Sequence, residues 1–229
     1  MGYGFLDIAV TPAVRAVQDR LGVAHLWENF KGHRTFDRFT DQEAAFITSR
    51  DSFYMATTSE TGWPYVQHRG GPQGFLTVLD DRSLAFADQR GNRQYISVGN
   101  LSTNDKVSLF LMDYPRRARL KIYALAEIVA LDADPALTAR VPGATAPKAE
   151  RIIRLHLEAF DWNCPQYITP RFTEAELTEA LRPVRDRIAE LEAENAALKA
   201  ALQTQGGAER GDGVLSPGDD AMRDGEWQR

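Results

Sequence analysis

Features typical of secreted and membrane proteins are scarce in this sequence. Cys164 is the only cysteine among 229 residues, so the chain cannot form the internal disulfides of a disulfide-stabilised secreted protein. No run of about 18 apolar residues occurs, so we expect no membrane-spanning segment and no membrane partner. The first ten residues lack a basic cluster, and Asp7 interrupts their apolar stretch, unlike a secretory signal. These absences predict a cytoplasmic protein.

Signals for nucleic-acid binding, metal binding and the commonest catalytic motifs are also missing. The 27 Lys and Arg residues do not exceed the 32 Asp and Glu residues, so the basic surface that nucleic acids require is not expected. The histidines at 25, 33, 68 and 156 show no metal-ligand spacing, and we predict no metal site. No nucleophile elbow, Walker A loop or dinucleotide fingerprint occurs. Cys164 has no His or Cys partner nearby, which predicts a structural role for it.

What the sequence does contain is a balance of 43% hydrophobic and 26% charged residues, which suits a folded globular domain. From residue 52 onward, strand-forming segments alternate with turn-like residues. Closely spaced strands of this kind, with one helix-sized insert at 92–103, favour a mainly β, α+β fold built as an antiparallel barrel. The predicted strands are 52–57, 64–69, 75–79, 83–88, 106–112, 119–131 and 151–162.

Two helix starts precede the strands. Thr11-Pro12 can open a short helix, and Thr40 with Glu43 matches a capping box, in which two side chains satisfy free backbone N–H groups. Elsewhere in residues 1–39 the aromatic residues are irregularly spaced, and we interpret this part as a wrapping segment docked on the core. Residues 133–148, rich in Ala and Pro, are interpreted as a surface excursion between the last two strands.

A heptad repeat near the C-terminus is the clearest periodic signal. Its apolar stripe is only two positions wide, which favours a coiled coil, and the alternative is an amphipathic helix lying on the barrel. One a position is asparagine, which favours a parallel dimer. The a positions are Leu181, Ile188, Asn195 and Leu202, and the d positions are Leu177, Val184, Leu191 and Leu198.

Charges flanking the heptad stripe agree with a parallel pair, because Arg187 and Glu194 at g face Glu192 and Lys199 at e of the other helix. Pro183 removes a backbone hydrogen bond and is expected to kink the first turns. We therefore divide the chain into four parts. These are a wrapping segment (1–39), a barrel domain (40–172), a coiled-coil dimerisation helix (173–203) and a disordered, Gly-rich tail (204–229).

Three segments at strand ends are suited to a bound anion or a polar ligand. Residues 67–75, QHRGGPQGF, allow close backbone approach and place the cation Arg69 beside it. Residues 88–101 hold two Gly-Asn pairs, and the helix expected there would present its N-terminus to an anion. Residues 162–172, WNCPQYITPRF, offer polar and stacking groups. The alternative is that the glycine-rich segments are plain turns and helix caps.

The order of these motifs resembles one known family. HRGGPQGF, a strand ending in Asp88, GNRQY and GNL, a VSLFLMD strand and NCPQYITPRF together resemble the pyridoxamine 5′-phosphate oxidase-related FMN-binding family over about residues 40–172. The resemblance implies that residues 40–172 form an FMN-binding split β-barrel. It also implies a homodimer, with FMN held at the subunit interface.

Site residues follow from the same resemblance. The end of the second strand would line one side of the flavin, and the 88–101 segment would hold the phosphate and the ribityl chain. Two later residues would reach the flavin from the facing subunit. The implied residues are Gln67, His68, Arg69 and Gly70, then Asp88, Gly91, Asn92, Arg93, Tyr95, Ser97, Asn100 and Leu101, and from the other subunit Gln166 and Tyr167.

The sequence also departs from the oxidases that give the family its name. GNRQY replaces their Arg-Lys phosphate signature, and the heptad helix replaces their C-terminal Trp and Arg element, which argues against vitamin B6 phosphate as substrate. We therefore expect an FMN-dependent oxidoreductase for another small organic molecule. His68, Tyr95 and Tyr167 are candidate proton donors by position alone. The alternatives are a non-catalytic flavin carrier or redox sensor whose coiled coil recruits a partner, and a haem-binding relative.

Overall fold

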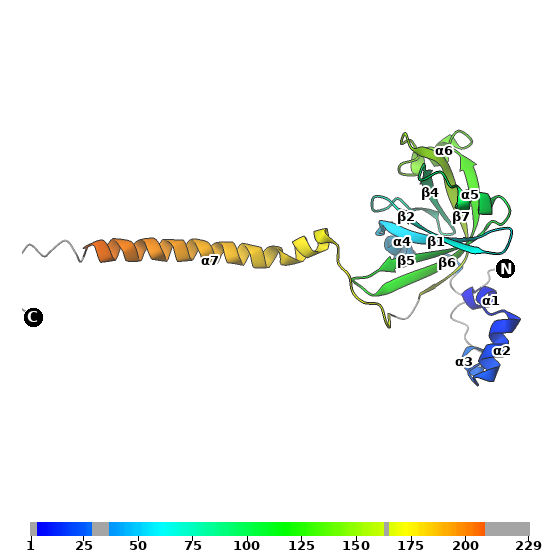
Figure 1. Ribbon diagram of the computed structural model, residues 1–229, viewed down its shortest axis with the longest axis horizontal. Helices are drawn as coiled ribbons and strands as arrows, with labels where there is room; N and C mark the ends of the chain where they lie inside the picture. Colours follow the sequence, from blue (N-terminus) through cyan, green and yellow to red (C-terminus); the bar gives the residue numbers. More distant parts are fainter. Residues whose placement is uncertain (1–3, 29–36, 163–164, 209–229) are drawn as a thin grey trace, which may run out of the picture. The chain divides into compact units, whose positions relative to one another are not determined.

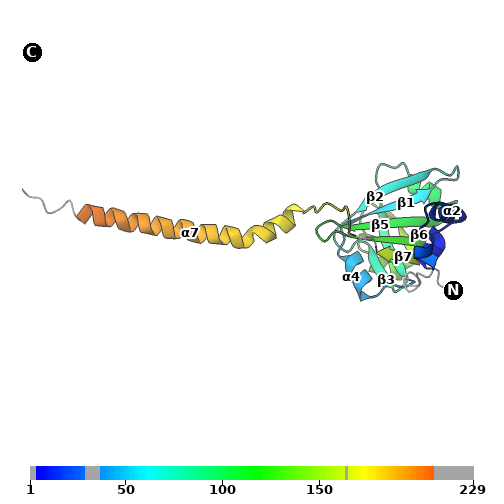
Figure 2. The same ribbon diagram turned by 90° about the horizontal axis from the view of Figure 1, so that it is seen from below.

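The computed structural model describes residues 4–28, 37–162 and 165–208 (Figures 1 and 2). The chain divides into two compact units, Met1–Arg171 and Phe172–Arg229. The predictions made for Cys164 and for the tail beyond residue 208 lie outside the described residues. In the part of the chain described, no helix has the length and apolarity needed to cross a membrane.

The first unit combines short helices with the strands of one sheet. Its helices are α1 (Phe5–Ala9), α2 (Pro12–Arg20), α3 (His25–Glu28), α4 (Asp41–Thr48), α5 (Ile96–Leu101) and α6 (Pro135–Arg140). Its strands are β1 (Ser52–Thr58), β2 (Pro64–Gly70), β3 (Thr77–Asp80), β4 (Ser83–Gln89), β5 (Lys106–Asp113), β6 (Ala118–Ala130) and β7 (Ala149–Trp162). The second unit is described as one helix, α7 (Glu174–Ala208).

All seven predicted strands are present, and they form one antiparallel sheet in the order β2-β1-β5-β6-β7-β4-β3. The sheet wraps around a single large core, so the predicted α+β fold with an antiparallel split β-barrel is confirmed (Figure 2). Side chains alternate between the two faces of each strand, so every second side chain of a central strand points into this core. On β5, for example, Val107, Leu109 and Leu111 are buried.

The third strand begins later than the sequence suggested. Phe75 and Leu76 precede β3 and are buried, and the Phe75 ring stacks on Phe53 at 5.6 Å between ring centroids. The Phe75 backbone N–H donates to the Pro72 carbonyl at 2.9 Å, so this residue still belongs to the turn. Pairing with β4 begins only at Thr77, which lies opposite Ala85, so β3 starts there.

Residues 133–148 are more than a surface excursion, which corrects the sequence interpretation. Asp134 caps α6 by accepting a hydrogen bond from the Leu137 N–H at 2.9 Å. Leu137, Val141 and Ala144 are buried and form a second, smaller core with Ile152 and its neighbours on β4 and β6. This segment therefore covers the face of β4 and β7 that the main core does not use.

The N-terminal helices attach to the barrel at defined points. Phe5 of α1 is buried and stacks on Tyr123 of β6 at 4.6 Å, with interplanar angle 2°. The predicted capping box of α4 is present, since Glu43 accepts from the Thr40 N–H at 2.9 Å. The other carboxylate oxygen of Glu43 accepts from Trp162 Nε1 at 2.7 Å, which ties α4 to the end of β7.

The helix α7 confirms the predicted C-terminal helix and extends to Ala208, five residues beyond its expected end. Pro183 lies inside it, and the ribbon bends in its first turns (Figure 2). Thr173 and Glu176 form the expected capping contacts, with the Thr173 N–H donating to Glu176 at 2.8 Å.

Candidate functional site

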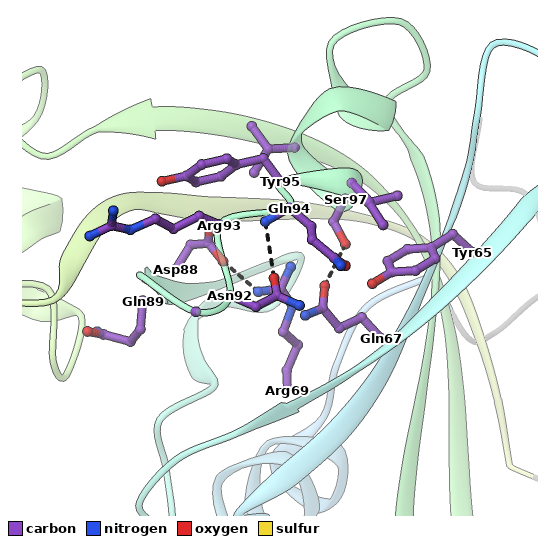
Figure 3. Close-up of a pocket in the computed structure, with 13 residues that line it drawn as sticks. Tyr65, Gln67, Arg69, Asp88, Gln89, Asn92, Arg93, Gln94, Tyr95 and Ser97 are labelled. Carbon is purple, nitrogen blue, oxygen red and sulfur yellow. Dashed lines mark hydrogen bonds and ion pairs between the residues drawn. The ribbon is translucent and has the colours of Figure 1, made fainter.

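A small polar pocket lies where β2, the end of β4 and the 90–98 segment meet (Figure 3). Its enclosed volume is about 50 Å³. In Figure 3 the rings of Tyr65 and Tyr95 flank the pocket from two sides, and Arg69 rises from β2 between them. The lining residues are Tyr65, Gln67, Arg69, Asp88, Gln89, Gly91, Asn92, Arg93, Gln94, Tyr95, Ile96, Ser97 and Val98.

Alternation along β2 selects which of its side chains reach the pocket. Tyr65, Gln67 and Arg69 are half-buried and point to it, whereas Val66 and His68 face the other side of the sheet. His68 packs edge-on against the Tyr54 ring, 5.6 Å away between centroids. His68 therefore does not line this pocket, because adjacent strand residues point in opposite directions.

Arg69 is held in place by a buried carboxylate. Its Nη1 lies 2.5 Å from Oδ1 of Asp88, which is only 6% exposed. Asp88 also faces Arg151, whose Nε is 3.5 Å from Oδ2. The Arg69 guanidinium lies over the Phe86 ring at 5.6 Å, and its Nε is buried without a hydrogen-bond partner. Asp88 thus orients a cation whose buried Nε has no hydrogen-bond partner among the described residues.

Glu150 forms a second layer that supports the pocket from behind. It accepts from Arg90 at 2.9 Å, from Arg151 at 2.6 Å and from the Tyr95 hydroxyl at 3.1 Å. The hydrogen bond from Arg90 lowers the pKa of Glu150 most. Desolvation opposes it, and Tyr95 and Arg151 lower the pKa further. An ionised Glu150 therefore fixes the Tyr95 ring at the edge of the pocket, where Arg151 lies over it at 5.3 Å.

The loop before α5 has an unusual backbone. Arg93 and Tyr95 both adopt left-handed conformations, with φ of 63° and 52°. Such values are uncommon for residues other than glycine and gather at functional sites. Asn92 stabilises the turn, since its Oδ1 accepts from the Gln94 N–H at 3.1 Å. The helix begins only at Ile96, several residues later than the expected insert, so Gly91 does not precede a helix N-terminus.

Residues of α5 serve two different purposes. The Ser97 hydroxyl donates to Oε1 of the Gln67 side chain at 3.1 Å, and Ser97 lines the pocket. Asn100 is buried and donates to Thr57 Oγ1 at 2.9 Å, and Leu101 belongs to the main core. These last two residues anchor α5 on the barrel and do not line the pocket.

The structure thus gathers eight of the residues that the resemblance implies: Gln67, Arg69, Asp88, Gly91, Asn92, Arg93, Tyr95 and Ser97. Gly70, at the end of β2, is not among the lining residues, and neither are Gln166 and Tyr167, which are exposed. Tyr167 instead borders a wide hollow on the outer face of β1, β2 and β5. Sequence reasoning missed Tyr65 and the supporting pair Glu150 and Arg151. Two-residue spacing from Gln67 would have indicated Tyr65.

Comparison with known proteins places these observations in a family. A family model described as pyridoxamine 5′-phosphate oxidase matches residues 39–163, more than half of the chain. The chain belongs to the pyridoxamine 5′-phosphate oxidase family. Every pocket residue lies within the part that matches this family.

Several solved structures are similar to this family member. A putative pyridoxamine 5′-phosphate oxidase from Lactobacillus delbrueckii is 23% identical with TM-score 0.43, covering 54% of this chain and 93% of that one. HutZ, the heme storage protein from Vibrio cholerae, is 18% identical with TM-score 0.40, covering 54% and 94%. An F420 reductase is 23% identical with TM-score 0.37, covering 51% and 94%. No curated protein matches the sequence.

Proposed function

We propose that this protein binds FMN, with the phosphate in the pocket around Arg69, and acts as an oxidoreductase on a small organic substrate. The observation that carries the proposal is the buried, unpartnered Nε of Arg69 in a pocket lined by further polar donors. Membership of the pyridoxamine 5′-phosphate oxidase family supports it. Bound FMN supplies the electron-transfer chemistry, and the protein supplies orientation and electrostatics.

The charges around the pocket favour an anion. The two carboxylates in its described contacts, Asp88 and Glu150, are each shared between arginines. Arg93 adds a further cation at the rim, and among the described residues none forms an ion pair with it. Cations therefore exceed anions, and guanidinium groups form strong charge-assisted hydrogen bonds to phosphate.

The size of the pocket limits which part of FMN it can enclose. Its volume of about 50 Å³ suits a phosphate group but is far below the ~300 Å³ or more of a typical small-molecule site. The polar groups of Gln67, Asn92 and Ser97 would hold the phosphate and the ribityl chain, and the ring system would lie outside. Tyr65 and Tyr95 at the edges are suited to contact an aromatic ring.

We further propose that a second copy completes the flavin site. The outer face of β1 and β2 exposes Tyr54 and Val66, and Trp63 in the turn between them is 76% exposed. Such apolar exposure is typical of a surface that another chain covers. Gln166 and Tyr167 would then contribute to the flavin site of the facing subunit, and Tyr167 is 93% exposed in the single chain.

Two matched asparagine substitutions test the phosphate site. Asn92 and Asn104 each accept a hydrogen bond, at 3.1 Å, from the backbone N–H two residues later, but only Asn92 lines the pocket. Asn92→Asp keeps the acceptor oxygen and replaces the donor NH₂ with negative charge next to the phosphate. We expect it to weaken FMN binding about tenfold or more, measured by flavin fluorescence titration.

Asn104→Asp makes the same chemical change outside the pocket, so FMN affinity should stay close to that of the parent. Equal affinity of the parent and Asn92→Asp would contradict the proposed phosphate position. A Soret band in the purified protein, with no flavin absorbance, would contradict FMN as the ligand. Substrate-driven bleaching of bound flavin then separates an oxidoreductase from a flavin carrier.

A further inference from the structure

The apolar stripe of α7 is exposed to solvent along its whole length. Its a and d side chains, from Leu177 to Leu202, are between 46% and 67% exposed wherever they are apolar. Asn195, the polar residue of the stripe, is exposed as well. Most of a helix's stability in proteins comes from packing its apolar face, so α7 gains stability by burying this continuous exposed stripe.

We infer that α7 pairs with α7 of a second copy as a parallel, in-register coiled coil. The surface of α7 has a hollow of the kind that holds a side chain of the partner helix in a coiled coil. A hollow on α7 is lined by Ile188, Leu191, Glu192 and Asn195, with Ala196 and Lys199 at its end. The spacing of the first four residues, +3, +4 and +7, defines the hole that accepts a d-position side chain in a parallel pair. Leu191 of the second copy fills it.

Charges favour a second copy in the same direction over other occupants. In a parallel pair, Arg187 lies across from Glu192 and Glu194 lies across from Lys199 of the other helix, so both contacts attract. The parallel register also sets Asn195 opposite Asn195, where the two amides can hydrogen-bond. An antiparallel pair sets Asn195 against a d-position leucine instead, which leaves the amide buried without a partner.

The proline does not obstruct this pairing. Pro183 occupies a c position, on the side of the helix away from the a and d stripe. The exposed ion pairs Arg182–Glu179, at 2.6 Å, and Arg187–Glu190, at 2.9 Å, link residues outside the stripe as well. The seam from Val184 to Leu202 therefore stays free for the partner.

Cysteine cross-linking in the full-length chain tests both pairing and direction. In a Cys164→Ser background, Asn195→Cys puts one thiol at the seam, and Ala193→Cys puts one two residues away at the outward f position. Oxidised glutathione, which is reduced as the disulfide forms, serves as the oxidant. We expect about tenfold more cross-linked dimer for Asn195→Cys than for Ala193→Cys, because only the first brings two Cβ atoms within disulfide reach.

The pair of variants separates α7 pairing from dimerisation elsewhere, since a barrel dimer would bring both thiols together to a similar extent. Equal cross-linking of the two variants, or none at residue 195, overturns the inference. Adding Leu191→Glu to Asn195→Cys should abolish the cross-link, whereas adding Ala193→Glu should preserve it. A cross-link that survives Leu191→Glu also overturns the inference. None of these results depends on flavin, so they leave the proposed function untouched.

Discussion

Glu43 shows how one side chain can join distant parts of the barrel. Burial raises the pKa of Glu43, but hydrogen bonds from Thr40 and Trp162 outweigh it, so the pKa lies below the ordinary value of 4.5. The carboxylate is therefore ionised in the folded protein although it is only 4% exposed. Its hydrogen bonds stabilise the junction of α4 and β7 more strongly in that form than in the protonated one.

Glu43→Gln should lower the free energy of unfolding by about 1–3 kcal/mol at neutral pH, because the amide replaces charge-assisted hydrogen bonds. A pKa lowered by folding gives stability that is complete above 4.5 and is lost as the pH falls through the folded-state pKa. The difference between parent and variant should therefore shrink on acidification, measured by urea unfolding from pH 7 to pH 3. Glu60→Gln, in an exposed turn, serves as the control. A difference that is constant with pH would contradict this account.

At this scale the sequence predicted residue types better than directions. Arg69 and Asn92, which the sequence predicts as ligand-binding residues because they accompany glycines at strand ends, both line the pocket. His68 and Asn100 belong to the same motifs, yet one faces across the sheet and the other is buried against Thr57. A motif gives the order of residues along the chain. Which of their side chains reach a pocket depends on the face of the strand or helix from which each one projects.

At the scale of elements, Pro183 is the residue of α7 that fits a helix interior least well. Proline inside a helix removes one backbone hydrogen bond and crowds the preceding turn. The neighbouring residues at and after Val184 carry the regular heptad, so the proline divides the first turns from the rest of the helix.

Pro183→Ala should stabilise α7 by up to about 3 kcal/mol and raise the helical signal in circular dichroism. Ala197→Pro places the same ring at the equivalent c position two heptads later, and it should destabilise the helix by a similar amount. The measurement is thermal unfolding of the full-length chain followed at 222 nm. If the melting temperature of Pro183→Ala is no higher than that of the parent, the proline does not strain the helix.

Elements in which the spacing of apolar residues repeats several times could be predicted from the sequence, whereas short elements could not. The strand β5 alternates over its 8 residues, β7 alternates from Ile153 to Ala159, and α7 repeats its heptad from Leu177 to Leu202. Helix α6 has only six residues, and its single buried side chain, Leu137, gives no period to detect. The second core was therefore hidden, since it forms only when Val141 and Ala144 meet strands far away in sequence.

The whole molecule divides its proposed tasks between two units. Every residue of the polar pocket lies in the unit Met1–Arg171, and the entire heptad lies in the unit Phe172–Arg229. Sites in separate compact units usually respond independently to change.

A chain ending at Phe172 should therefore bind FMN within about twofold of the full-length affinity. We expect it to remain a dimer through the barrel, with lower stability, as measured by sedimentation and flavin titration. The full-length chain is the reference, and the cross-linking variants at residue 195 report on the part removed. A truncated chain that is monomeric and free of flavin would show that α7 is the principal dimerisation element.

The edge strand β2 carries two surfaces on one backbone, and this constrains how related sequences can diverge. Substitutions at Val66 or His68 alter the outer face and leave the pocket face unchanged, so the two faces can vary separately. Insertion or deletion of one residue has the opposite effect, because it exchanges the faces of every residue beyond it. Residues 66 and 68 should therefore vary together with the surface that covers the outer face, while the length of the strand between Pro64 and Gly70 stays fixed.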